Sequence, residues 1–150
     1  MSSQKFDLEN FLPYLLNQAA EASSLAFQKV YKERYGMLRT EWRVLFHLGL
    51  YGEMSASEIG LRARMHKTKI SRAVQRLTER RFVERARDAS DRRVERLTLT
   101  AQGRAAYHDL HAVAEEYQRK LEIGLEPDEL DVLRRALGKL AGGAGETPQD

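Results

Sequence analysis

The chain has 150 residues, a formal net charge of +3, 31% charged residues and 42% hydrophobic ones, which together exclude a disordered chain and predict a globular protein. It contains no cysteine, which excludes disulfides, thiolate metal sites and thiol redox chemistry. No apolar run approaches 18 residues and no apolar signal region follows Met1, so we expect a cytoplasmic protein without a membrane partner.

The first predicted element is a long helix over residues 8–35, because apolar residues recur there at steps of three and four. Pro13 indicates either an irregular first turn or a helix that begins at that point. The apolar stripe is longer than one helix needs to dock on a small core, so part of it is expected to contact another chain. We therefore predict a homodimer.

The next two predicted helices are shorter. One covers residues 40 to 49 or 52, where glycines end the apolar pattern. Ser55 and Glu58 then form a capping-box pattern, in which the serine hydroxyl accepts from the backbone of Glu58 and the glutamate reaches back. This pattern predicts a helix over residues 56–64.

A helix over residues 66–80 is predicted to have two different faces. Ile70, Val74 and Leu77 are spaced at i, i+4 and i+7, so they share one face and are expected to be buried. The other face is polar and carries Thr68, Lys69, Arg72, Gln75 and Arg76.

Residues 82–86 and 94–99 alternate between apolar and polar side chains, which predicts two strands joined by the charged turn 87–93. Thr100 is expected to cap a long helix that ends near residue 124. Pro127 begins a last helix with a narrow leucine stripe that ends at Leu140. The glycine-rich segment 141–150 is predicted to be a flexible tail.

The order of short helix, turn, second helix and hairpin is that of a winged helix-turn-helix. We therefore predict a mainly α fold with a small β-wing. In this prediction residues 1–150 form a single domain, with the winged helix-turn-helix over 40–99 and dimerisation helices over 8–36 and 100–140.

The charge distribution is compatible with double-stranded DNA as the partner. Residues 62–96 contain thirteen Lys or Arg and five Asp or Glu, a net charge of +8, so the rest of the chain sums to −5. Such a basic centre is typical of nucleic-acid binding, although a solvated surface gives the same composition.

The types of side chain suggest how DNA would be read. Arg72 and Arg76 match the two acceptors of guanine, and Gln75 can pair with adenine. Single donors position a helix on phosphates, which is the role predicted for Thr68, Lys69 and Ser71. In the wing, Arg92 or Arg93 is expected to reach a narrow minor groove, while Asp88 and Asp91 brace neighbouring arginines.

Several of these segments resemble the MarR family of multiple-antibiotic-resistance regulators. The similar segments are Ser55 to Glu58, Lys67 to Arg72, Arg76 to Arg80, Phe82 to Arg85, Asp91 to Arg93, and Leu97 to Thr100 with Gly103. The resemblance covers residues 8–140.

The resemblance implies that Lys69, Ser71, Arg72 and Arg76 lie in the major groove. Lys67, at the start of the same segment, is also included among the predicted DNA-binding residues. It also implies that Arg93 is a minor-groove arginine oriented by Asp91. An obligate homodimer on an inverted-repeat operator is implied as well. One departure is Arg81, where the family usually has glycine, so the turn after the recognition helix is expected to differ locally.

An effector pocket is a second implication. MarR-like regulators commonly release DNA when a small, often phenolic or anionic, compound binds between the dimerisation helices and the winged domain. The candidate residues are Tyr31, Tyr35, Arg39, Trp42, Arg43, Phe46 and His47. Ordinary packing between the first two helices is the preferred interpretation of the aromatic members and His47, whereas Arg39 or Arg43 could hold an acid group.

The sequence gives no indication of an enzyme, a cofactor or a metal site. It has no glycine-rich phosphate loop, no zinc-protease helix and no nucleophile elbow. His108 and His111 could hold a metal together with His47 or His66, but we interpret them as surface residues.

We predict a sequence-specific, effector-responsive repressor. Two alternatives remain open, a non-specific architectural DNA-binding protein and a winged-helix protein-interaction module.

Overall fold

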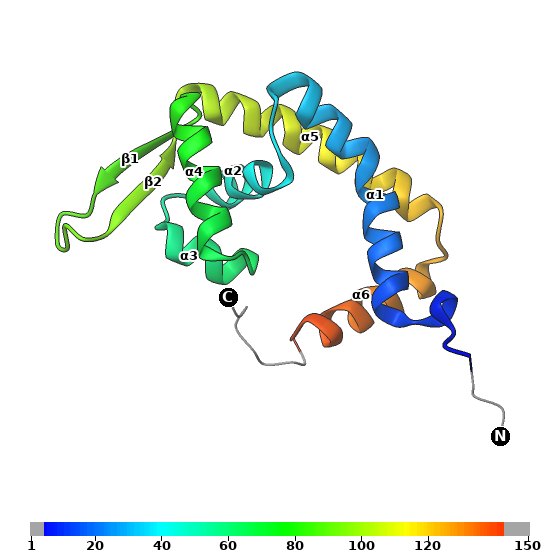
Figure 1. The fold of residues 1–150 in the computed structure, drawn as a ribbon. Helices are drawn as coiled ribbons and strands as arrows, with labels where there is room; N and C mark the ends of the chain where they lie inside the picture. Colours follow the sequence, from blue (N-terminus) through cyan, green and yellow to red (C-terminus); the bar gives the residue numbers. More distant parts are fainter. Residues whose placement is uncertain (1–4, 143–150) are drawn as a thin grey trace.

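The structure is a computed structural model that describes residues 5–142. Within this range it is mainly helical with one small antiparallel sheet, as predicted (Figure 1). The elements are the short 3-10 helix η1 (Leu8–Asn10), α1 (Leu12–Tyr35), α2 (Arg39–Tyr51), α3 (Ala56–Ala63), α4 (Lys67–Glu79), β1 (Val83–Arg87), β2 (Glu95–Leu99), α5 (Ala101–Ile123) and α6 (Pro127–Gly142).

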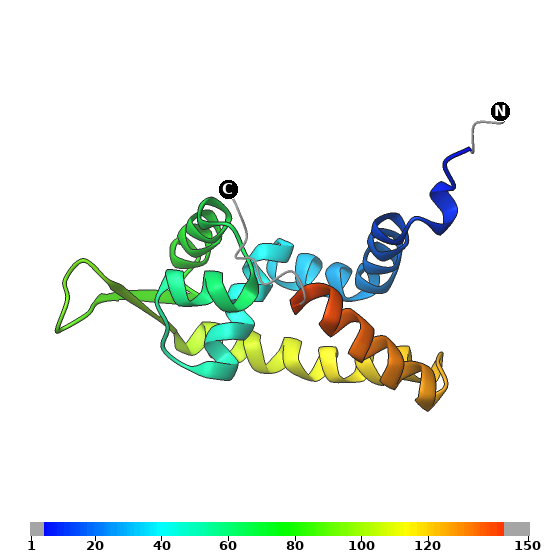
Figure 2. The same cartoon turned by 90° about the horizontal axis from the view of Figure 1, so that it is seen from below.

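The first helix begins four residues later than the predicted boundary. Leu8–Asn10 forms η1, and α1 starts at Leu12 with Pro13 in its first turn, where the missing N–H of proline has no helical partner to lose. It ends at Gly36, which adopts the left-handed conformation with φ 62°. Figures 1 and 2 show that α1 changes direction about midway along its length.

The bend in α1 has a local cause. The hydroxyl of Ser23 donates to the carbonyl of Ala20, and that of Ser24 donates to the carbonyl of Glu21. Hydroxyls that bond back to the preceding turn bend a helix, because they compete for its carbonyls. The half of α1 before this point therefore diverges from the half that packs on the rest of the chain.

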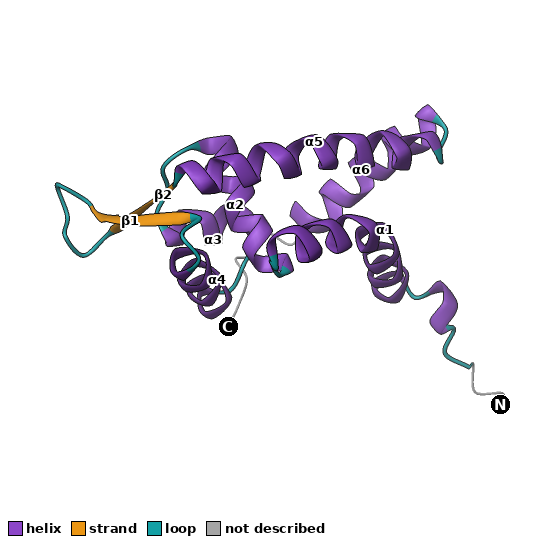
Figure 3. Ribbon diagram, turned by 90° about the horizontal axis from the view of Figure 1, so that it is seen from above, coloured by secondary structure: helices purple, strands orange, loops and turns teal. Residues whose placement is uncertain are grey.

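The core lies where α2, α3, α4 and the base of the hairpin meet α5. Its fully buried side chains include Leu45, Ile59, Leu77, Leu97 and Leu110, one from each of these elements. Helix α5 extends from this core to the far end of the molecule, and the hairpin projects on the opposite side (Figures 2 and 3). The winged helix-turn-helix is thus a packed unit with a helical arm.

The predicted capping box is only half present. The hydroxyl of Ser55 accepts from the backbone N–H of Glu58 at 3.1 Å, as expected. The carboxylate of Glu58 does not return to Ser55 but accepts from Arg96 at 2.8 Å. An arginine from another element therefore takes the place of the local donor.

Both strands of the hairpin begin one residue later than predicted; the first also ends one residue later, whereas the second ends at Leu99 as predicted. The register joins Val83 to Leu99 and Arg87 to Glu95. Met54 forms an isolated antiparallel bridge with Leu97, which attaches the base of the hairpin to the segment before α3. In β1 only Val83 is buried, and the four residues that follow it are exposed on both faces of the strand.

The close approach of α5 to the hairpin explains why position 103 is a glycine. The hydroxyl of Thr100 caps α5 by accepting from the backbone N–H of Gly103 at 2.9 Å. A Cβ atom at Gly103 would lie 2.0 Å from the backbone oxygen of Phe82. The first turn of α5 can therefore approach the hairpin only without a side chain at this position.

The turn after α4 keeps the conformation that glycine would adopt, contrary to the local change expected from the sequence. Arg81 has φ 64°, and Phe82 donates its N–H to the carbonyl of Leu77, which closes the end of the helix. A non-glycine residue in this region is disfavoured by about 1 kcal/mol or more. The turn is therefore retained at a cost in stability.

Replacing Arg81 with Gly is expected to stabilise the protein by about 1 kcal/mol, because glycine adopts positive φ without a steric penalty. In thermal unfolding at fixed protein concentration, Tm should rise by about 3 °C. Arg81→Ala removes the same charge but keeps the strained backbone, so it should leave Tm nearly unchanged. An equal rise in both variants would show that the charge, and not the backbone, is responsible.

The helices outside the winged helix-turn-helix, namely η1, α1, α6 and the far end of α5, form the arms of the molecule, and large apolar side chains are exposed on them. They lie on η1 and the first half of α1, at the end of α5 and along α6, and include Phe11, Leu12, Leu15, Leu16, Leu121, Ile123, Val132, Leu133, Leu137 and Leu140. Figure 1 shows the start of α1 and the start of α6 at the end of the molecule away from the wing, from which α6 runs back until Ala141 accepts a hydrogen bond from Arg64. Helix α6 continues to Gly142, so residues 141 and 142 of the predicted flexible tail are helical, and residues 143–150 of that prediction lie outside the described residues.

Candidate nucleic-acid interface and effector pocket

Helix α4 is fixed by one face and exposed on the other. Ile70, Val74 and Leu77 are buried, as the spacing predicted. His66 caps the start of the helix, since its ring nitrogen Nδ1 accepts from the backbone N–H of Thr68 at 3.2 Å. Its first turn contains no acidic residue, so the positive end of the helix dipole is uncompensated there.

The exposed face of α4 divides into two parts. Lys67, Thr68, Lys69, Ser71 and Arg72 are exposed, and within the described chain the side chains of Lys67, Lys69 and Arg72 have no hydrogen bond or ion pair. These residues lie in the N-terminal half of the helix, so they are available to a partner.

The C-terminal half of this face is already engaged with the protein. The amide of Gln75 donates to Glu79 at 2.7 Å and accepts from Nη2 of Arg85 at 2.9 Å. Nε of Arg76 lies 3.3 Å from the carboxylate of Glu41, although the arginine side chain is half exposed. Neither residue is as free as Arg72.

Glu41 is a buried carboxylate that the sequence reasoning did not identify. Its side chain is fully buried; Oε2 accepts from the backbone N–H of Leu38 at 3.2 Å, and Oε1 lies 4.0 Å from Nη1 of Arg80. Among the described residues Oε1 has no hydrogen-bond donor. Arg80 also donates to the backbone oxygens of Tyr35 and Gly36. Arg80, which follows α4, therefore connects that helix to the end of α1 and to the start of α2.

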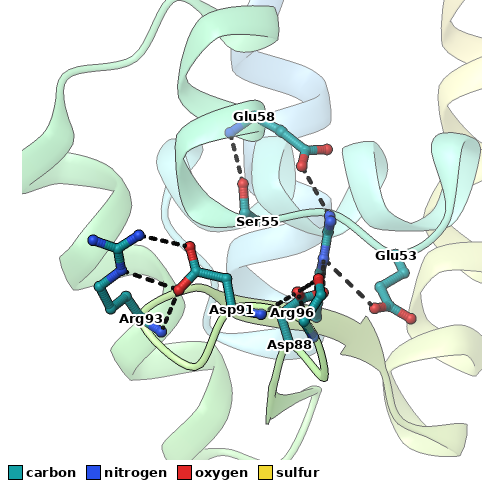
Figure 4. Close-up of polar contacts among 8 residues, drawn as sticks. Glu53, Ser55, Glu58, Asp88, Asp91, Arg93 and Arg96 are labelled. Carbon is teal, nitrogen blue, oxygen red and sulfur yellow. Dashed lines mark hydrogen bonds and ion pairs between the residues drawn. The ribbon is translucent and has the colours of Figure 1, made fainter.

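In the wing, both carboxylate oxygens of Asp91 accept hydrogen bonds from the guanidinium of Arg93. Nε and Nη2 of Arg93 donate to the two oxygens at 3.1 and 3.2 Å (Figure 4). The Arg93 side chain is still 91% exposed. The hydrogen bonds that Arg93 donates to Asp91 hold the pKa of the Asp91 carboxyl below its usual value. The predicted bracing of Arg93 is therefore present in the structure.

Asp88 organises the turn that leads to Asp91. One of its carboxylate oxygens accepts from the backbone N–H groups of Ser90 and Asp91 at 3.1 and 2.9 Å. Hydrogen bonds from the Ser90 hydroxyl, from the Asp91 backbone and from Arg96 lower the pKa of Asp88. Arg92 lies in the same turn with its side chain exposed.

Two arginines outside the predicted site connect the wing to the helices. Arg85 of β1 contacts Gln75 of α4 and Glu95 of β2, while Arg96 of β2 contacts Asp88 in the turn and Glu58 on α3. Both were recognised in the sequence only as members of a basic segment. No local pattern could reveal their partners, because these partners lie on other elements.

A separate pocket of about 220 Å³ lies between α1 and α2. Four of the predicted effector residues line it, namely Tyr31, Arg39, Trp42 and Arg43, together with Ala20, Ser24 and Phe27, which the sequence analysis did not include. Burial raises the pKa of the Tyr31 phenol, which keeps it neutral. The pocket thus combines aromatic walls with two guanidinium groups.

The arginines of this pocket are held differently. Nη2 of Arg39 lies 3.4 Å from the hydroxyl of Ser24 and 3.7 Å from the carboxylate of Glu21. Nη2 of Arg43 donates to the backbone oxygen of Ala63 at 2.6 Å, at the end of α3. Arg43 therefore connects the pocket to the helix-turn-helix.

The other three predicted effector residues do not line this pocket. The hydroxyl of Tyr35 donates to Asp109 of α5 at 2.6 Å, and burial together with this carboxylate raises its pKa to about 12. Phe46 packs edge-on against Tyr107 with ring centroids 5.3 Å apart. Nδ1 of His47 is hydrogen-bonded to the carbonyl of Arg43 at 2.6 Å.

His111 is paired with Glu115, at 2.8 Å, and His108 is exposed. Residues 5–142 contain no group of three His, Cys, Asp or Glu side chains arranged to hold a metal ion. Over the same range, no helix has the length and apolar character needed to cross a membrane.

The sequence comparisons agree with the fold. The model of the MarR family matches residues 35–94, from the end of α1 to the wing. The uncharacterised HTH-type transcriptional regulator YwoH of Bacillus subtilis strain 168 is 24% identical over 110 residues, which are 72% of this chain and 80% of YwoH.

Solved structures extend the likeness to the arms. BpsR of Bordetella bronchiseptica, whose DNA binding is regulated by 6-hydroxynicotinic acid, is 22% identical, with a TM-score of 0.83 over 93% of this chain and 99% of BpsR. A MarR/EmrR family transcriptional regulator from Acinetobacter sp. ADP1 is 25% identical, with a TM-score of 0.82 over 93% and 99% of the two chains. The arrangement of arms and winged helix is therefore one found in transcriptional regulators.

Proposed function

We propose that this chain, a winged helix-turn-helix transcription regulator of the MarR family, acts as a homodimeric, effector-responsive repressor on an inverted-repeat operator. The observation that carries the proposal is the exposed N-terminal half of α4, where Arg72 and Lys69 have no partner in the described chain while the opposite face is buried. An α-helix with such a face fits the major groove of DNA.

In this proposal Arg72 reads a guanine through its planar fork, while Lys67, Thr68, Lys69 and Ser71 position the helix on phosphates. Arg76 and Gln75 contribute less to base reading than the sequence suggested, because each already has a protein partner.

The wing supplies the second contact in the proposal. Arg93 enters the flanking minor groove, since a narrow minor groove attracts an exposed guanidinium, and Asp91 keeps that guanidinium oriented. Arg92 extends the same positive tip.

Dimerisation is supported by the exposed apolar side chains of α1, α5 and α6. In a single chain Leu133 and Leu137 are 44% and 42% exposed, and they share a face of α6 with Leu140. Monomeric soluble proteins rarely expose contiguous apolar patches of this kind. A second copy would cover the same surface on both chains and would present two α4 helices to successive major grooves.

The experiment that tests this function is a DNA titration followed by fluorescence anisotropy, with the DNA upstream of the gene as the probe. A repressor of this type should bind that DNA at least about a thousandfold more tightly than random DNA at physiological salt. Equal affinity for both would indicate an architectural protein. The absence of any salt-dependent binding would favour a protein-interaction module.

The effector in this proposal is an aromatic acid with a hydroxyl group. The pocket offers aromatic walls, a neutral tyrosine hydroxyl and Arg39, and the DNA binding of the fold relative BpsR is regulated by a compound of this class. Arg39 is held by a long hydrogen bond to the Ser24 hydroxyl and by an exposed ion pair with Glu21, both weak contacts, so a carboxylate can replace Glu21 as its partner. Arg43 would pass the change to α3 through Ala63.

Added 6-hydroxynicotinic acid is expected to change the fluorescence of Trp42, the single tryptophan of the chain, in a saturable manner. Arg39→Ala should weaken this binding by about ten- to a hundredfold, because a charge-assisted hydrogen bond is lost. Arg62→Ala serves as the matched control, since Arg62 lies over Tyr51 outside the pocket. Equal affinity in all three proteins would remove Arg39 from the site.

A further inference from the structure

Apolar packing fixes the base of the wing, where Val83, Leu97 and Leu99 are buried, but it does not fix the outer part. Beyond Val83, every residue of β1 is exposed, and a hollow of about 500 Å³ lies between the hairpin, α3 and α4. Arg85, Arg93 and Arg96 are among the residues that line this hollow. The orientation of the outer part of the wing therefore depends on polar contacts that cross from the hairpin to the helices.

Arg96 makes the contacts that reach α3. Its Nη1 lies 2.8 Å from Oε1 of Glu58, and its Nε lies 3.3 Å from Oδ1 of Asp88 (Figure 4). Glu53 approaches the same Nε at 4.0 Å. One guanidinium thus joins the second strand, the turn of the wing and the helix-turn-helix.

The contacts continue from Arg96 to the exposed arginine at the tip. The other oxygen of Asp88 accepts from the backbone N–H of Asp91 at 2.9 Å, and Asp91 accepts from the backbone N–H and the side chain of Arg93. Each link is a hydrogen bond to a charged group, a stronger type than a neutral hydrogen bond.

We propose that Arg96 is a positioning residue, which fixes the wing relative to α3 of the helix-turn-helix so that Arg93 and Arg72 engage one operator half-site together. This inference rests on the proposed DNA-binding function. Three carboxylates surround Arg96, so its charge is already compensated and it is not a phosphate contact. The role requires a planar fork, because one head group must serve Glu58 and Asp88 in different directions.

The first test is a double-mutant cycle on operator affinity. Arg96→Lys keeps the charge but cannot form both contacts, and it should lower affinity about tenfold, as should Arg93→Ala. The double variant should also lose about tenfold, because both changes remove the same wing contact. Independent effects would multiply to about a hundredfold. A hundredfold loss, or an Arg96→Lys protein with unchanged affinity, would overturn the proposal.

The matched control is Arg104→Lys. Arg104 is an exposed arginine in the first turn of α5, and its side chain has no partner among the residues described, so this change should leave affinity unaltered. Hydroxyl-radical footprinting should show that Arg96→Lys loses protection only in the flanking minor groove. Loss across the whole site would indicate a general structural defect instead.

A second measurement does not need DNA. In the free protein, Arg96→Lys should speed amide hydrogen exchange in residues 88–94 while exchange in α4 stays unchanged, since the core is untouched. Unchanged amide exchange in the wing would overturn the positioning role of Arg96, even if no operator were found. Conversely, faster amide exchange in a protein that does not bind DNA would refute the proposed function but would support the structural role of Arg96 in the wing.

Discussion

Replacing both Leu133 and Leu137 with Asp is expected to convert the protein into a monomer and to lower operator affinity by about a thousandfold or more. The reason is that two linked half-site contacts act with a high effective concentration, which is lost when the chains separate. Both side chains are more than 40% exposed in the single chain, so the winged core should stay folded. Analytical ultracentrifugation gives the oligomeric state, and anisotropy gives the affinity.

The control for this change is Arg135→Asp, which places the same acid on the opposite side of α6. It should remain dimeric. The far-ultraviolet circular dichroism of the double variant should match that of the parent apart from a small loss at the arms. A double variant that stays dimeric and binds the operator normally would place the interface elsewhere.

The second large effect is expected for Arg72→Ala, which should weaken operator binding by about ten- to a hundredfold per half-site, because one bidentate base contact is worth about 1–3 kcal/mol. Its affinity for random DNA should change far less, so sequence preference is lost. Anisotropy against both DNAs, at several salt concentrations, separates these effects.

Lys67→Ala provides the contrast for that experiment. A phosphate contact carries no sequence information, so its loss should weaken binding to operator and random DNA alike and should lower the salt slope by about 1. If Arg72→Ala behaved in the same uniform way, Arg72 would be a phosphate contact and the reading of bases would have to be assigned to another residue.

Much of the fold could be predicted because local patterns determine it. The i, i+4, i+7 spacing of Ile70, Val74 and Leu77 predicted the buried face of α4, and the structure confirms it. The caps at Ser55 and Thr100 were predicted from residue type and position, because each hydroxyl serves a backbone N–H only three residues away.

The contacts that organise the candidate site were not predictable from the same patterns. Arg76 was interpreted as a base-reading residue because its spacing places it on the polar face of α4, and nothing near it in sequence indicates that Glu41 lies beneath it. Arg96 and Glu58 are similarly separated by 38 positions. Periodicity shows which side of an element a residue occupies, whereas its partner depends on how the elements assemble.

The effector residues show the same limit. Tyr31, Arg39, Trp42 and Arg43 share a pocket because α1 and α2 cross there, whereas Tyr35, one turn further along α1, is bonded to Asp109 instead. Helical spacing alone cannot distinguish these two environments.

The two faces of α4 also affect how this protein can diverge after gene duplication. The anchoring side chains, such as Ile70 and Leu77, determine whether the helix docks, while Lys69 and Arg72 have no side-chain partner in the described part of the chain. Substitutions at such exposed positions usually change folding free energy by within about 0.5 kcal/mol. A duplicated copy can therefore acquire a new target promoter through mutations at these positions while its native state persists.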